Sequence, residues 1–208
     1  MRDALLLGLV FGVGAALAVG PIFVTIIHEA AARGFMSSFK VILGSAIADL
    51  ILLIPALALS WAIARVGAAS AWVGAAGALF FVYLGFGAGR DAWRLWRGGE
   101  LPRAPAGWSF WKGVLGNLLN PLTWTFWLAT GTPTMLRAYR QAGWAGLLVF
   151  TSTWFVVASG LEAAIALAVV RSRRLVGARG MALLNGFAAT MFLALAAGLL
   201  ATGGLPRP

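Results

Sequence analysis

Two acidic residues lie deep inside strongly apolar stretches of the sequence. Asp49 falls within the stretch 39–64, and Glu162 falls within the stretch 142–170. Each lies about ten residues from one end of its stretch, which is roughly 15 Å along a helix. A charge so deep in a bilayer costs at least about 2.5–3.5 kcal/mol, so both side chains should face the protein interior or a wet cavity.

These two carboxylates predict a site for a proton or a cation. A carboxylate in the membrane can bind and release a proton during a transport cycle, or pair with the ammonium group of a substrate. The structural alternative is a protonated carboxyl that only forms hydrogen bonds. Glu162 is not the counterpart of Asp49 in an internal repeat, because Val149 stands 100 residues after Asp49.

Two proline-containing pairs interrupt apolar stretches at equivalent positions. Gly20-Pro21 and Asn120-Pro121 are 100 residues apart. Proline cannot donate to the preceding helical turn, and glycine or asparagine tolerates unusual backbone angles. A helix that restarts at the proline would present free N–H groups and a positive dipole end, which attract an anion such as a carboxylate. The alternative is two ordinary kinked membrane helices.

The composition excludes several classes of protein. Hydrophobic residues make up 61% of the 208 residues and charged residues only 11%, whereas soluble domains carry about 25% charged residues. A soluble enzyme, a disordered chain and a nucleic-acid-binding domain are disfavoured, although the net charge is +10. Cysteine is absent and His28 is the one histidine, which argues against disulfides, thiolate chemistry and a multi-histidine metal site.

The apolar stretches predict an all-α membrane protein with six transmembrane helices, because about 20 apolar residues cross a bilayer as a helix. The predicted spans cover residues 4–27, 39–64, 69–89, 113–136, 142–170 and 181–202. Of the 16 basic residues, 11 fall in the odd-numbered gaps and 5 at the ends and in the even-numbered gaps. The richer side should be cytoplasmic, which places both termini outside.

The chain should consist of two repeats of three helices. Residues 1–90 form the predicted first repeat, residues 91–112 a basic cytoplasmic linker, and residues 113–208 the second repeat. Because three is odd, the second repeat must enter the membrane in the opposite sense. Paired Gly/Pro interruptions in inverted repeats indicate a transporter binding site near the midplane.

Three further features carry less weight. Gly8-x-x-x-Gly12 and Gly85-x-x-x-Gly89 permit close helix packing, within the chain or in a homodimer. His28 and Glu29 follow the first span and are expected to be solvated. Two tryptophans near the second break should pack in the core or line a substrate path; they are Trp124 and Trp127.

The order of these motifs resembles a known family. Gly20-Pro21 is followed by Arg33-Gly34, by a Gly-x-x-x-x-Asp pattern ending at Asp49, and by the run GVLGNLLNP ending at Asn120-Pro121. This arrangement is similar to the lysine exporter translocator family of the LysE/RhtB type, whose members are six-helix bacterial inner-membrane exporters of amino acids. The resemblance covers nearly the whole chain, and the Asn-Leu-Leu-Asn-Pro run is its most specific part.

The resemblance implies efflux of an amino acid or a related small solute, coupled to the proton motive force. It also implies that Gly20-Pro21, Asp49 and Asn120-Pro121 correspond to motifs of the family. The family often has proline where this chain has Val19, and lysine where this chain has Leu122. The second difference removes a positive charge from the expected site.

The sequence therefore predicts a secondary exporter in the bacterial cytoplasmic membrane that works by alternating access. Its partners are a small-molecule substrate and membrane lipid, with no nucleic acid and no cofactor. The predicted substrate and coupling site comprises Gly20, Pro21, Asp49, Asn120, Pro121 and Glu162.

Two alternatives remain open, namely export of an inorganic cation by Asp49 and Glu162, and a membrane scaffold that transports nothing. An enzyme is disfavoured because no serine hydrolase pattern is present, and ATP coupling is disfavoured because no P-loop is present.

Overall fold

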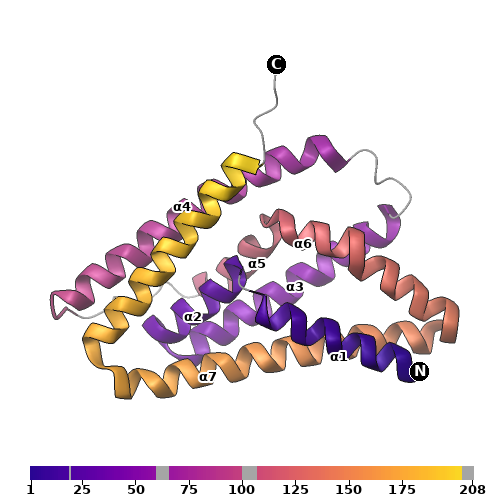
Figure 1. Ribbon diagram of the computed structural model, residues 1–208, viewed down its shortest axis with the longest axis horizontal. Helices are drawn as coiled ribbons and strands as arrows, with labels where there is room; N and C mark the ends of the chain where they lie inside the picture. The colour runs from indigo at the N-terminus through magenta and orange to yellow at the C-terminus, as the bar shows by residue number, and fades with distance from the viewer. Residues whose placement is uncertain (19, 60–65, 100–106, 203–208) are drawn as a thin grey trace.

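The computed structural model describes residues 1–18, 20–59, 66–99 and 107–202, and helices account for nearly all of these residues (Figure 1). In chain order the elements are α1 (Arg2–Leu17), α2 (Pro21–Arg33), α3 (Phe35–Leu59), α4 (Val66–Trp96), α5 (Trp108–Leu118), α6 (Pro121–Phe126), the π-helical turn η2 (Trp127–Gly131) and α7 (Thr132–Thr202). No strand occurs in the described residues. The prediction of an all-α protein is confirmed.

Helix α7 is hydrogen-bonded along its length but reverses its course, so its arms run in different directions (Figure 1). Gly143 has a φ of +59°, a left-handed conformation that glycine adopts without strain. A Cβ at Gly146 would overlap the carbonyl oxygen of Ala138, because the chain folds tightly here. Residues 137–141 and 171–180, which separate the predicted spans, therefore belong to α7, which bends instead of ending.

Several helices are suited to a membrane. Among the described residues, three segments are long and apolar enough to cross a bilayer, namely Phe35–Ile54 in α3 and Thr132–Ser172 and Ala178–Gly198 in α7. The pair α1 and α2 passes the same test jointly, with a bend of 63° between its helices. The protein is thus a multi-pass membrane protein, and its outer surface exposes large apolar side chains such as Leu79, Phe86 and Val156.

Closely packed glycines join helices from different parts of the chain. A Cβ at Gly8 or Gly12 would lie 2.8–2.9 Å from atoms of α7, and one at Gly85 would lie 3.0 Å from Leu193 of α7. The expectation that these glycines serve packing within the chain is confirmed. A Cβ at Gly44 of α3 would overlap the Phe110 carbonyl oxygen of α5, so small residues let these backbones approach closely.

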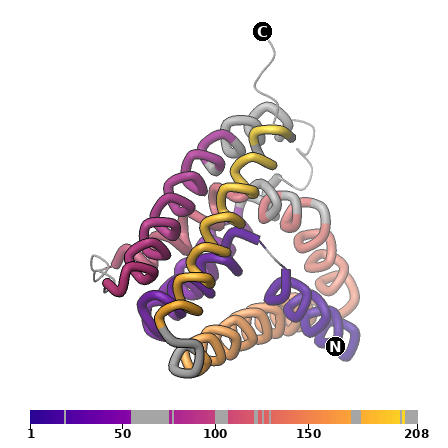
Figure 2. The backbone as a smooth tube through the Cα atoms, turned by 60° about the vertical axis from the view of Figure 1, so that its left-hand side comes forward, coloured from indigo at the N-terminus to yellow at the C-terminus, as the bar shows by residue number. Residues whose placement is uncertain are grey.

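Helix α4 and the last arm of α7 lie side by side and run in opposite directions (Figures 1 and 2). Their contact is a core of alanines and aromatic rings, in which Phe81 stacks on Phe192 with a centroid distance of 6.5 Å. This pair forms one wall of the molecule.

The remaining helices surround the two helix breaks. Where the sequence predicts the linker 91–112, α4 continues to Trp96 and α5 begins at Trp108. Residues 100–106, which include Pro102 and Pro105, lie outside the described residues.

Candidate functional site

Both predicted helix breaks are present. Helix α1 ends at Leu17 and α2 begins at Pro21, with Gly20 in an extended conformation at the N-cap. Helix α5 ends at Leu118 and α6 begins at Pro121. In both cases the first helical hydrogen bond after the break runs back to the residue before the proline, from Val24 N to Gly20 O and from Thr123 N to Asn120 O, at 3.0 Å each.

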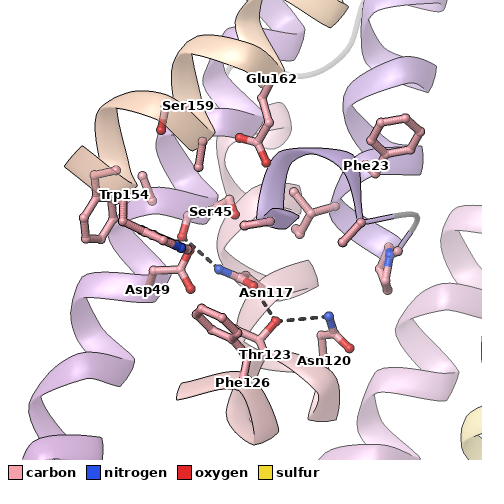
Figure 3. A pocket seen from close by; sticks show the side chains of 18 residues that line it. Phe23, Ser45, Asp49, Asn117, Asn120, Thr123, Phe126, Trp154, Ser159 and Glu162 are labelled. Atoms are coloured by element: carbon pink, nitrogen blue, oxygen red, sulfur yellow. Dashed lines mark hydrogen bonds between the residues drawn. The ribbon is translucent and has the colours of Figure 1, made fainter. Parts of the chain in front are cut away.

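A cavity of about 220 Å³ lies where the two breaks meet (Figure 3). Five of the six predicted site residues line it: Gly20, Pro21, Asp49, Asn120 and Glu162. The sixth, Pro121, follows Asn120 directly, and its side chain is outside the described residues. The cavity therefore brings together predicted site residues that are up to 142 positions apart in the sequence, as the interval from Gly20 to Glu162 shows.

Asp49 is held in a fixed position on the cavity wall. It projects from α3, its side chain is only 8% exposed, and its Oδ1 accepts a hydrogen bond of 2.7 Å from Trp127 Nε1. Trp127 is itself 2% exposed and packs edge-on against Trp154, with a centroid distance of 5.1 Å. Of the two tryptophans predicted near the second break, Trp127 thus positions a candidate site carboxylate.

The second break is held by an amide and hydroxyl network (Figure 3). Asn117 Nδ2 donates to the Ser45 carbonyl oxygen at 2.9 Å, which joins α5 to α3. Thr123 Oγ1 donates to Asn117 Oδ1 at 2.7 Å, and Asn120 Nδ2 donates to Thr123 Oγ1 at 3.0 Å. The sequence reasoning missed Asn117 and Thr123 as site residues, although Asn117 belongs to the Asn-Leu-Leu-Asn-Pro run that carried the resemblance.

Glu162 approaches the cavity from another direction. It lies on α7, three residues after the cavity-lining Ser159, and its carboxyl group extends into the space above Asp49 (Figure 3). No lysine, arginine or histidine is among the described residues that line the cavity. The two carboxylates therefore face a cavity whose described lining supplies no basic side chain.

A second group of charges lies outside the cavity. We call it the charge cluster; its members are His28, Glu29, Arg33, Asp91, Ser109 and Lys112. Glu29 is fully buried and accepts hydrogen bonds from Arg33 at 2.9 Å, from Ser109 at 2.7 Å and from Lys112 at 2.7 Å. Arg33 also donates to Asp91 Oδ2 at 3.1 Å. The cluster thus ties α2 to α4 and α5.

The expectation that His28 and Glu29 are solvated is wrong. His28 is 5% exposed and its Nε2 lies 3.6 Å from Asp91 Oδ2. Lys112, which was counted among the charges of the basic linker, is 7% exposed. These groups tolerate burial because each charge has an opposite partner, which local sequence reasoning on single helices could not find.

Asp91 follows the apolar stretch 69–89 of α4. Burial raises the pKa of Asp91, but the neighbouring His28 and Arg33 favour the carboxylate more strongly, so that its pKa lies below the usual value.

The side chains that line the cavity limit the chemistry that it can support. The described residues contain no group of three or more histidines, cysteines or acidic residues that could hold a metal ion. The lining offers two carboxylates, amide and hydroxyl groups, the start of α2, and the aromatic residues Phe126 and Trp154. Such a lining suits a small polar solute that enters and leaves unchanged.

A bundle of apolar helices that surrounds a cavity at two helix breaks, with carboxylates in the cavity wall, is the arrangement expected of a membrane transport protein. A model of the LysE type translocator family matches residues 13–203 of this chain, and the chain belongs to that family. It is therefore a multi-pass membrane transporter that exports small solutes. No curated protein and no solved structure matches the chain.

Proposed function

We propose that the protein is a proton-coupled secondary exporter of an amino acid or a closely related small solute, which acts by alternating access at the cavity between the two breaks. The observation that carries this proposal is the meeting of both breaks and two carboxylates, those of Asp49 and Glu162, in one cavity. We further propose that the protein resides in the bacterial cytoplasmic membrane with both termini outside, as its basic residues predict.

The size of the cavity supports a small solute. Its volume is about 220 Å³. Pockets for drug-sized ligands occupy about 300–1,000 Å³. The volume of this cavity is therefore closer to the size of a single amino acid than to that of a drug-sized ligand.

The polar groups of the cavity match the two charges of an amino acid. Asp49 supplies a carboxylate for the ammonium group. Helix α2 has 13 residues and starts at Pro21 in the cavity lining. The backbone N–H groups of its first turn and its dipole provide a favourable environment for the solute carboxylate.

The same two carboxylates support proton coupling. Asp49 and Glu162 both line the cavity, with no basic side chain in its described lining. Two negative charges in a confined space repel each other, and binding of a proton or of a cationic solute relieves this repulsion. A proton and the ammonium group of the solute would compete for the same carboxylates, and this competition would couple export of the solute to entry of protons.

The charge cluster supports alternating access. Glu29 lies eight residues beyond Pro21 on α2, or about 12 Å along the helix. On the predicted orientation this places the cluster between the cavity and the cytoplasm, where it fastens α2 to α4 and α5. We infer that the structure is closed toward the cytoplasm and that the cluster separates when solute enters.

The packing also supports two inverted three-helix repeats. Helix α1 packs against α7 through Gly8 and Gly12, and α5 packs against α3 through Gly113. In the proposed repeats α1 corresponds to α5, and α3 corresponds to the middle arm of α7. The helix before each break, α1 or α5, therefore packs on the second helix of the other repeat. Two repeats related by a two-fold axis would show this arrangement.

Inorganic cation export is the second candidate, because two carboxylates line the same cavity. Uptake into proteoliposomes of a panel of radiolabelled amino acids and of Na⁺, K⁺ and Mg²⁺ distinguishes the candidates. The panel is measured with and without a pH gradient, beside liposomes that carry the Asp49→Asn variant. We expect uptake of at least one amino acid that depends on the pH gradient and on Asp49. Uptake of a cation alone, or no uptake at all, would contradict the proposal.

A further inference from the structure

Trp154 is a buried donor in the cavity wall without a hydrogen-bond partner. It projects from α7, is 6% exposed and lines the cavity. Its Nε1 finds no hydrogen-bond acceptor in the described part of the chain. Its neighbours differ, because Trp127 Nε1 donates to Asp49 and Trp124 Nε1 donates to the Leu118 carbonyl oxygen. A buried indole N–H usually has a partner, so the exception at the cavity wall calls for a ligand.

The indole ring of Trp154 cannot easily turn to find another acceptor. It stacks on Phe126 at a centroid distance of 5.9 Å with an angle of 22° between the ring planes. Trp127 packs edge-on at 5.1 Å and Phe155 at 4.8 Å. Aromatic contacts on several sides fix the ring, so the N–H direction is set before any ligand binds.

The position of Trp154 relates it to Asp49. Both side chains contribute to the same region of the cavity wall (Figure 3). Trp127 contacts both of them, through its hydrogen bond to Asp49 and its ring contact with Trp154. A solute whose cationic group is bound by Asp49 would therefore hold its adjacent atoms close to Trp154.

We propose that Trp154 Nε1 donates a hydrogen bond to an oxygen of the transported solute, and that this bond selects solutes with an acceptor oxygen next to their ammonium group. The inference rests on the proposed function and defines its substrate class more narrowly. An α-amino acid carries its carboxylate oxygens three bonds from the ammonium nitrogen, whereas the corresponding decarboxylated amine has none. Trp154 is thus a specificity residue, and simple amines should be poor substrates.

The test uses substitutions that remove only the N–H group. Trp154→Phe keeps an aromatic ring, and incorporation of 3-benzothienylalanine at position 154 keeps the bicyclic shape while sulfur replaces the N–H. Trp144→Phe is the matched control, because Trp144 lies on the same helix and is 69% exposed. Transport kinetics are measured in proteoliposomes for the best amino acid of the twenty standard ones and for its decarboxylated amine.

We expect both position-154 variants to raise KM for the amino acid by about ten- to one-hundred-fold, the range for a hydrogen bond to a charged group. Their maximal rate and the kinetics of the amine should change less than about three-fold, and Trp144→Phe should behave as the wild type. If Trp154→Phe fails to fold, the benzothienyl variant, which keeps the shape of the side chain, still tests whether the N–H group is needed for binding.

Two results would overturn the inference in distinguishable ways. An unchanged KM for the amino acid in the benzothienyl variant would show that water, and not the solute, satisfies the Trp154 N–H, while the proposed function would stand. If the wild-type protein transports none of the twenty amino acids, both the proposed function and the role of Trp154 are wrong.

Discussion

At the scale of single residues, the proposed transport depends on Asp49, a buried acidic residue that accepts a hydrogen bond from Trp127. Trp127 Nε1 donates to Asp49 Oδ1 at 2.7 Å, and Asp49 lines the cavity. The bond fixes where the negative charge lies, so that a solute ammonium or a proton can reach it. The charge itself, rather than the shape of the side chain, should therefore be required.

The first prediction is that Asp49→Asn lowers transport by at least about thirty-fold. The amide oxygen can still accept the bond from Trp127, but the charge that pairs with the solute is lost, which is worth about 2–5 kcal/mol for a buried pair. Initial rates of amino-acid uptake into proteoliposomes measure the effect.

The control for this substitution is Asp3→Asn, an equally conservative change at an exposed position of α1. It should leave uptake unchanged. Equal activity of Asp49→Asn and the wild type would remove Asp49 from the site.

At the scale of secondary-structure elements, the two breaks and the glycine contacts set the geometry of the cavity. Both breaks could be predicted from Gly20-Pro21 and Asn120-Pro121, because proline acts on its own helix and leaves a local signal. The continuity of α7 through its bends and the π-helical turn η2 could not be predicted, since a helix that bends at a glycine such as Gly143 has no distinct local pattern.

The second prediction concerns the second break. Pro121→Ala should lower uptake at least about ten-fold, because alanine lets α5 and α6 join into one helix that would displace Asn120 from the cavity lining. The protein should still insert in the membrane. Pro133→Ala serves as the comparison, because Pro133 is exposed on α7. Normal uptake by the Pro121 variant would mean that the break at this position is not needed.

The third prediction concerns the contact between α3 and α5. Gly44→Ala should destabilise the protein by about 1–3 kcal/mol, as overpacking does, because the new Cβ would overlap the Phe110 carbonyl oxygen. Gly87→Ala is a matched helical glycine with nothing within 4 Å of the new Cβ, and it should be neutral or slightly stabilising. Thermal unfolding in detergent compares the two variants, and equal melting temperatures would refute the close contact.

At the scale of the whole molecule, the sequence predicts a membrane protein correctly but not how its charges pair. The apolar composition and the basic gaps predict the multi-pass architecture. A membrane span leaves a signal over a long stretch of sequence, because about 20 consecutive residues must be apolar to cross the lipid. The charge cluster needs Glu29, Asp91 and Lys112 to meet across three helices. Such long-range pairs leave no local signal, so sequence reasoning predicted that Glu29 is solvated.

The fourth prediction tests the orientation. The chain contains no cysteine, so single cysteines can be introduced without a background. In intact bacterial cells a membrane-impermeant maleimide should label Asp3→Cys and should not label Arg97→Cys until the membrane is opened. The reverse pattern would place the termini inside and would put the charge cluster on the outer side of the cavity.

The central claim is that the solute passes through the cavity. The most direct test is whether bound solute protects Ser159→Cys from a thiol reagent. Ser159 lines the cavity on α7, whereas Arg97 is exposed outside it. In proteoliposomes, the amino acid that gives the highest uptake should slow labelling of Ser159→Cys by a small thiol reagent and leave labelling of Arg97→Cys unchanged. If saturating solute leaves the labelling rate of Ser159→Cys as it was, the solute does not occupy this cavity and the account is wrong.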